Sequence, residues 1–200
     1  MFNRSHYSSP VYISEPELME SNSFVSFNFE QACPDYFACK VAFVVVENGS
    51  IVKEKEYLIQ PPNNDYHSSF SICHGVTAED TRRLWQFDKL WPILRSYLRD
   101  KFIIAHTLRS ELQILNKSLR FYGLRGVRIK NSLCTAELYS HNTIYDIARV
   151  LGLNYDKCSS TLLEARLCAL SYLKYLDTRE IPLELQTKIM KNYRDKNGTN

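Results

Sequence analysis

The stretch that decides the fold is residues 23–60, SFVSFNFEQACPDYFACKVAFVVVENGSIVKEKEYLIQ. Alternating apolar and polar residues predict a strand over 23–29, and the apolar run VAFVVV predicts a second strand over 37–46 that is buried on both faces. After the second strand, Asn48-Gly49 supplies the positive φ angles of a hairpin turn. Residues 51–60 then pair back as a third strand, which Pro61-Pro62 ends.

After this antiparallel meander the hydrophobic period becomes helical. Thr77 is a predicted N-cap with Asp80 three residues on, and apolar residues recur at helical spacing from Leu84 to Leu98. Leu163, with the leucines at 167, 170 and 173, predicts the apolar face of the last long helix. The remaining predicted elements are strands over 101–106 and 127–133 and helices over 111–122, 143–151 and 160–176. This order predicts an α/β fold with a mixed five-stranded sheet flanked by helices.

The length of 200 residues, 44% of them hydrophobic, is enough for one globular domain. We expect a flexible N-terminal arm over 1–22, a folded domain over 23–177 and a polar C-terminal tail over 178–200 with a weak helical segment after Pro182. The arm contains the segment VYIS, which gives the hypothesis that it adds a strand to a partner's sheet or swaps between protomers.

Composition gives expectations about the ligands and the cellular location of the protein. The net charge of +3 permits nucleic-acid binding without arguing for it. The six cysteines form no CxxC pair, the N-terminus has no apolar signal region, and no apolar run approaches the ~18 residues of a transmembrane helix. We therefore expect an intracellular, cytoplasmic protein with free thiols and no membrane partner, and the nucleus stays open as a location.

Four short motifs follow one another along the predicted elements. They are NFEQ at 28–31, ICHGVT at 72–77, AHTLRSE at 105–111 and SSTLLEA at 159–165. In order and spacing they resemble the motifs of the DEDDh type (DnaQ-like, ribonuclease H-like fold) of 3′–5′ exonuclease, which read Asp-Phe-Glu-Thr, Ile-His-Gly-Ile-Thr, Ala-His-Asn-x-x-Phe-Asp and His-x-Ala-Leu-x-Asp-Ala. The resemblance covers roughly residues 23–176 and implies the ribonuclease H-like fold.

The resemblance also implies a reaction, and this chain departs from what that reaction needs. Such exonucleases hold two Mg²⁺ or Mn²⁺ ions with four carboxylates and use a histidine to take a proton from water. The positions that match are Asn28, Glu30, Glu111, Glu164 and, for the histidine, Ser159. Only Glu30 is retained: Asn28 carries no charge, both other acids are one methylene longer, and serine accepts no proton near neutral pH.

The resemblance therefore implies a catalytically degenerate exonuclease, a pseudoenzyme, with a metal site of Glu30 and Glu164 that is weak or absent. Its cofactor would be Mg²⁺ or Mn²⁺, if it takes any. Replacement of several positions favours natural degeneration over an engineered Asn28. Two alternatives stay open: an active metal-dependent exonuclease in which Glu30, Glu111 and Glu164 act with Asn28 as a neutral ligand, and a purely structural protein that binds partners.

A degenerate domain of this kind would serve as a nucleic-acid-binding module or a protein-interaction scaffold. The partners would be single-stranded DNA or RNA, between which the sequence does not decide, or another protein. The basic and aromatic segment RFYGLRGVRIK at 120–130 is either a contact for a nucleic-acid backbone or a solvated edge of the fold. His74 and His106 each also have a structural interpretation as a hydrogen-bonding residue. The candidate nucleic-acid-binding residues are Gln31, His74, His106, Arg120, Arg125, Arg128 and Lys130.

Overall fold

The computed structural model describes residues 11–13, 21–155 and 160–186. Its centre is a sheet with the strand order β4-β3-β2-β5-β7. Strands β2 (Phe24–Gln31), β3 (Ala38–Glu47) and β4 (Ser50–Leu58) form the antiparallel meander, while β5 (Phe102–Ala105) and β7 (Asn131–Cys134) run parallel to β2. The predicted mixed five-stranded sheet is confirmed. The hairpin turn is also as predicted, since Asn48 and Gly49 have φ angles of 49° and 77°.

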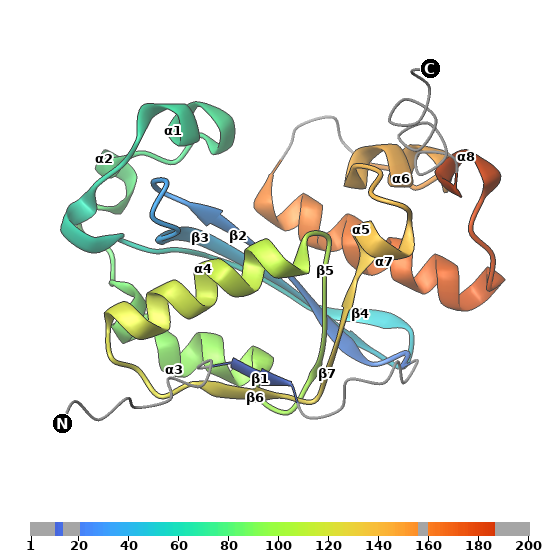
Figure 1. Ribbon diagram of the computed structural model, residues 1–200, viewed down its shortest axis with the longest axis horizontal. Helices are drawn as coiled ribbons and strands as arrows, with labels where there is room; N and C mark the ends of the chain where they lie inside the picture. The colour runs from blue at the N-terminus through green and yellow to red at the C-terminus, as the bar shows by residue number, and fades with distance from the viewer. Residues whose placement is uncertain (1–10, 14–20, 156–159, 187–200) are drawn as a thin grey trace, which may run out of the picture.

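Helices cover both faces of this sheet (Figure 1). The odd-numbered apolar residues of β2, among them Val25 and Phe27, pack against α3 (Phe87–Leu98) and α4 (Leu108–Phe121). Ala42 and Val44 of β3 face the other way, toward α6 (Ile144–Val150) and α7 (Thr161–Thr178). Strand β3 is therefore buried on both faces, which explains its unbroken apolar run.

The buried face of α7 differs from the predicted leucine face. Of the predicted leucines only Leu167 is fully buried, while Leu163 and those at 170 and 173 are half-buried. The other side chains that the helix buries include Ala165, Cys168 and Tyr172. Small residues at the contact let the helix backbone approach the sheet, and the leucines then fill the margins of the interface. A helix buried over a broad face has no single apolar stripe that the spacing of its leucines could reveal.

The segment that was predicted as one strand over 127–133 forms two. Strand β6 (Val127–Ile129) pairs in parallel with β1 (Val11–Ile13) in a separate small sheet, and only β7 joins the main sheet. Buried residues alternate without interruption from Val127 to Leu133, so the sequence pattern does not show that the chain changes sheets at Lys130. The pairing also places a strand from the N-terminal arm on its own chain.

The predicted helical region from Thr77 to Leu98 is likewise interrupted. Helix α2 (Ala78–Thr81) has the expected capping box between Thr77 and Asp80, and α3 begins only at Phe87. The connection is a turn that ends in an isolated bridge between Gln60 and Gln86, where the backbone N–H of Gln60 donates to the carbonyl oxygen of Trp85 at 3.1 Å. Before α2 lie a short 3₁₀ turn (Pro62–Asn64) and α1 (Ser68–His74), a helix that the sequence analysis did not predict.

Part of the predicted polar tail packs against the domain. Helix α8 (Leu183–Gln186) buries Leu185 beside Tyr139, which follows the short helix α5 (Thr135–Leu138), and beside Ile147 of α6. The side-chain amide of Asn142 donates to the carbonyl oxygens of Tyr139 and Leu185, at 2.8 and 2.9 Å. The folded unit therefore extends past residue 177. Within the described ranges, no helix has the length and apolar content to cross a membrane.

We expect Asn142→Ala to lower the free energy of unfolding by about 1–3 kcal/mol, because it leaves two buried carbonyl oxygens without their donor. Chemical denaturation measures this change. The neighbouring exposed residue provides the control, His141→Ala, which should shift the midpoint very little. Equal stability of both variants would mean that α8 is not held by this side chain.

Candidate functional site

Three acidic residues and one amide meet where β2 ends. Asn28 and Glu30 lie near the C-terminal end of strand β2. Glu111 lies in the first turn of helix α4, and Glu164 in the first turn of helix α7. Helix α4 follows β5, which lies parallel beside β2, so its first turn reaches the same edge of the sheet. The structure thus brings together four positions that are far apart in the sequence. We call Glu30, Glu111 and Glu164 the carboxylate cluster.

Glu111 lies at the bottom of the cluster and is only 4% exposed. Its Oε2 accepts a hydrogen bond from the backbone N–H of Phe29 at 2.7 Å, and its Oε1 accepts one from the Thr107 hydroxyl at 3.3 Å. Burial, together with the charges of Glu30 and Glu164, raises the pKa of Glu111 to about 8. The side chain fastens α4 to the backbone of β2.

Glu164 is held by an amide and a phenol. The Nδ2 of Asn28 donates to Oε2 of Glu164 at 3.1 Å, and the Tyr145 hydroxyl donates to Oε1 at 2.9 Å. Both carboxylate oxygens therefore have protein donors. Tyr145 comes from α6, so this contact joins three elements of the fold.

Glu30 is the one acid that is identical to its counterpart in the exonuclease motifs, and its neighbours have opposite effects on its pKa. Burial, together with the nearby charge of Glu164, raises its pKa to about 7. The Thr161 hydroxyl donates to its Oε1 at 3.3 Å. Lys40, its partner on β3, acts in the opposite direction, but the Lys40 ammonium forms an ion pair with Glu56 at 3.1 Å. Among the ion pairs of the described residues, none includes Glu30.

The residue at the position of the general base, Ser159, lies outside the described residues. Its neighbour Ser160 caps α7 by accepting a hydrogen bond from the backbone N–H of Leu163 at 3.1 Å.

These side chains do not fit a pair of divalent cations. A two-metal site needs several carboxylate oxygens that point into one open space and are free to coordinate. Here Glu111 is directed into the backbone of β2, and Glu164 receives N–H and O–H donors on both oxygens. Asn28, at the position that the resemblance matches to a bridging carboxylate, presents its N–H group to the cluster. No group of three or more histidine, cysteine or acidic side chains in the described ranges has the arrangement of a metal site.

The two candidate histidines are engaged in structural contacts. His74 lies within hydrogen-bonding distance of the Gln31 carbonyl oxygen through Nε2, at 3.1 Å, and accepts the Val76 N–H at Nδ1. Burial lowers its pKa. His106 contacts the Thr135 hydroxyl at 3.1 Å, and burial lowers its pKa to about 4. Both rings are therefore mainly neutral at pH 7 and add no positive charge for a phosphate.

Most of the basic segment 120–130 lies away from the cluster. Lys130 adjoins Asn131, which pairs with Phe102 at the start of the parallel strands. Glu30 lies six residues along β2 from its first residue, roughly 20 Å toward the opposite end of the sheet. Arg128 there forms an ion pair with Asp100 at 2.6 Å, and the Arg125 carbonyl oxygen accepts a hydrogen bond from Trp91. Arg120 is the exception, because it lies on α4.

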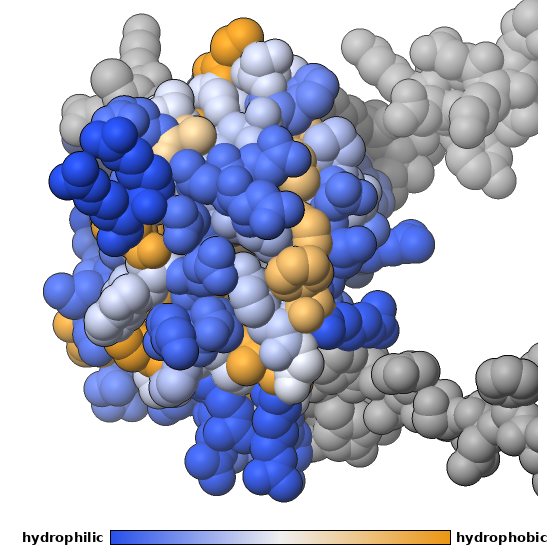
Figure 2. Space-filling model, turned by 90° about the vertical axis from the view of Figure 1, so that its left-hand side faces the viewer, coloured by the Kyte–Doolittle hydropathy of each residue, from blue (hydrophilic) through white to orange (hydrophobic). Residues whose placement is uncertain are grey.

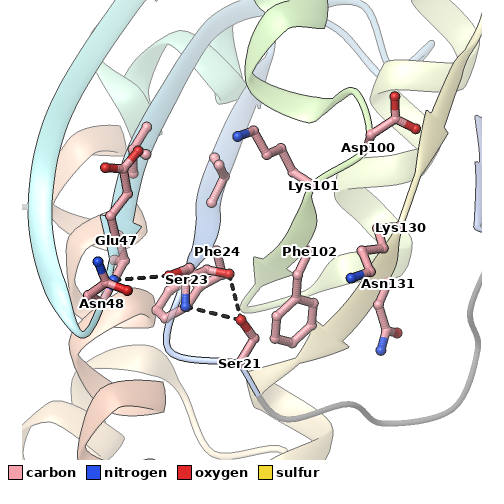
Figure 3. Close-up of a pocket in the computed structure, with 13 residues that line it drawn as sticks. Ser21, Ser23, Phe24, Glu47, Asn48, Asp100, Lys101, Phe102, Lys130 and Asn131 are labelled. Carbon is pink, nitrogen blue, oxygen red and sulfur yellow. Dashed lines mark hydrogen bonds between the residues drawn. The ribbon is translucent and has the colours of Figure 1, made fainter.

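The structure also has a pocket of about 500 Å³ that the sequence analysis did not predict, at that same start of the parallel strands (Figure 3). Lys101, Lys130 and Asn131 lie along one side of it, and Glu47 and Asn48 lie along the other. Its charges are mixed, and it is separate from the carboxylate cluster. It therefore gives no preference for an anionic ligand.

Sequence reasoning missed the residues that hold the carboxylate cluster. Thr107 precedes Glu111 by four residues, so helical spacing could have indicated this contact, whereas Thr161 contacts Glu30 across the fold and no local spacing indicates it. No local signal indicates Tyr145 or Lys40, which approach from another helix and a neighbouring strand.

The fold and the position of the cluster define the class: the chain has the fold of 3′-exonucleases. No protein-family model and no curated protein sequence matches it. Among solved structures it is similar to a full-length 3′-exonuclease, with a TM-score of 0.65 and 13% identity over 78% of this chain and 82% of the other. Exonuclease X in complex with 5′ overhanging duplex DNA gives 0.59 and 13% over 78% and 93%. A 3′-exonuclease with 3′-end specific recognition of a histone mRNA stem-loop gives 0.64 and 13% over 80% and 65%.

Proposed function

We propose that this domain is a degenerate member of the DEDDh exonucleases that binds nucleic acid without hydrolysing it. The observation that carries the proposal is the contact between Asn28 and Glu164. At the position where the resembling enzymes have a carboxylate that bridges two metal ions, this chain has an amide that donates a hydrogen bond to another acid of the cluster. Both carboxylate oxygens of Glu164 are thereby satisfied within the protein.

The loss of hydrolysis follows from the donor set. Phosphodiester hydrolysis by two metals needs a cation to lower the pKa of water and another to stabilise the leaving oxygen. Glu30 alone among the cluster has an oxygen without a described protein donor, and a single carboxylate binds Mg²⁺ weakly. With the bridging carboxylate absent, we expect any remaining rate to lie far below that of a complete site, since losing one positioned base alone costs ~10²–10⁴-fold.

Nucleic acid is the favoured ligand for two reasons. One protein with this fold is in complex with duplex DNA and another recognises a histone mRNA stem-loop, and the net charge of +3 is compatible with such a ligand. The face around α1 and α2 shows mostly hydrophilic side chains with small, separate apolar areas (Figure 2). A broad protein-docking surface would instead present a continuous apolar patch of several hundred Å².

The test is an incubation of 5′-labelled single-stranded DNA and RNA with the wild-type protein and Mn²⁺, alongside a binding titration of the same strands. We expect intact strands and binding that weakens as salt rises, with dissociation constants of about 10⁻⁶–10⁻⁴ M near physiological salt. Mn²⁺ is the more demanding choice because it tolerates poorer ligand geometry than Mg²⁺.

Glu30→Ala, purified in the same way, is the matched control for contaminating nucleases. A ladder of 3′-shortened products that requires Mn²⁺ and disappears in Glu30→Ala would establish the alternative, an active exonuclease with an altered ligand set. Intact strands without any binding would overturn the nucleic-acid proposal and favour a scaffold for protein partners.

A further inference from the structure

A groove of about 870 Å³ runs along the exposed side of α4. Tyr36, from the connection between β2 and β3, and Glu137, from α5, contribute to its lining beside the helix. Leu108, the first residue of α4, lies in it only three positions before Glu111. Tyr36 follows the end of β2 by a few residues and Leu108 begins the helix that carries Glu111, so the groove is built on elements that also carry the carboxylate cluster.

The charge of this groove is predominantly positive. Arg109, Lys117 and Arg120 line it from one side of α4, at the i, i+8 and i+11 positions of the helix, and all are exposed. They span about 17 Å along the helix axis at 1.5 Å per residue. In the part of the chain that the structure describes, no ion pair joins any of these three cations to a carboxylate. Glu137 is the one acidic residue of the lining.

Uncharged side chains suited to bases lie among these cations. Tyr36 is half-buried in the groove wall, and Gln113 lies one helical turn from both Arg109 and Lys117. The Lys117 ammonium lies 5.3 Å from the centre of the Phe37 ring, which packs edge-on against Phe121 at 4.9 Å. Phe121 remains 56% exposed at the end of the helix. Cations for phosphates alternating with aromatic faces for bases are the chemistry by which proteins hold single strands.

We propose that this α4 groove is the binding path for single-stranded nucleic acid. The inference rests on the proposed function and assigns it to a surface. The proposed surface differs from the basic segment 120–130 that the sequence suggested, because only Arg120 of that segment lines the groove. A single strand is favoured over a duplex because its bases are free to stack on Tyr36 and its neighbours.

The experiment compares fluorescence-anisotropy titrations of labelled 12-nucleotide DNA and RNA strands at several salt concentrations. The groove variant combines Arg109→Ala, Lys117→Ala and Arg120→Ala. We expect it to bind roughly ten- to a hundredfold more weakly near 0.05 M salt, and the slope of log K against log salt to fall by about 2, since each phosphate contact contributes about 0.7. Tyr36→Leu, which keeps an apolar side chain against the core, should weaken binding about fivefold or more.

The matched control removes the same charge elsewhere, through Lys55→Ala, Arg83→Ala and Lys89→Ala, which are exposed and lie outside the groove. We expect its affinity to stay within about threefold of wild type, and unchanged unfolding midpoints would show that all variants fold. Equal weakening by groove and control variants would overturn the groove and mean that only overall charge matters. So would a loss confined to a variant of Arg125, Arg128 and Lys130. Failure of the wild-type protein to bind any strand would instead overturn the proposed function itself.

Discussion

Glu111→Gln should make the protein more stable at pH 8, by about 3 kcal/mol. Burial raises the pKa of this carboxyl from 4.5 to about 8 in the folded protein. Between these values the folded state binds a proton that the unfolded state has released, so the stability contributed by Glu111 is fully present below pH 4.5 and is lost as the pH rises through about 8. Each unit of pKa shift corresponds to about 1.4 kcal/mol, which sets the upper limit of the effect.

Glutamine removes this loss while keeping the useful contact. Its amide oxygen still accepts the Phe29 N–H, and its NH₂ group lies near the Thr107 hydroxyl, which accepts a hydrogen bond as readily as it donates one. Urea denaturation at pH 5 and pH 8 measures the difference. The two proteins should have similar stability at pH 5, and the variant should lose less between the two values. The exposed Glu137→Gln is the control and should leave the pH dependence unchanged. A variant less stable than wild type at pH 8 would show that Glu111 is ionised in the folded protein and stabilised by its donors.

The strands of the meander were predictable because each carries its own signal. The apolar run of β3 and the Asn48-Gly49 turn report local conformation and burial directly. The split at Lys130 and the break before Phe87 were not predictable, because each depends on a hydrogen bond or a pairing with a distant segment: β1 for the first and Gln60 for the second. Local periodicity contains no information about such partners.

The site shows the same limit at the level of side chains. The resemblance located Asn28, Glu30, Glu111 and Glu164, and the structure brings these four positions together. It did not show how they interact, because Tyr145 and Lys40 come from elements whose approach only the tertiary fold decides. The basic segment near residue 125 was selected by composition alone, and composition does not report which end of the sheet a charge occupies.

Asn28→Asp should make the stability of the protein depend on a divalent cation. The substitution removes the N–H donor that lies 3.1 Å from Glu164 and replaces it with a carboxylate beside the remaining acids. At an effective dielectric constant of about 20, two unit charges at roughly 3–4 Å repel by about 4–5 kcal/mol, and proton uptake will relieve part of this. We therefore expect a loss of about 2–4 kcal/mol at pH 8 in the presence of EDTA.

Mn²⁺ should reverse most of that loss, because a cation compensates the added charge and takes the oxygens that the aspartate presents. Denaturation with EDTA and with millimolar Mn²⁺ measures the response. Asn28→Ala loses the same hydrogen bond without adding a charge, so it should be destabilised by about 1 kcal/mol and should not respond to Mn²⁺. Wild-type protein should not respond either.

The contrary outcome is that Asn28→Asp unfolds at the same midpoint with and without Mn²⁺. In that case the missing charge at position 28 is not what keeps metal out of the cluster, and the longer side chains of Glu111 and Glu164 with their donors exclude it instead. A Mn²⁺ response in the aspartate variant alone would show that the Asn28 amide, by donating to Glu164, stabilises the cluster in the way that a bound cation otherwise would.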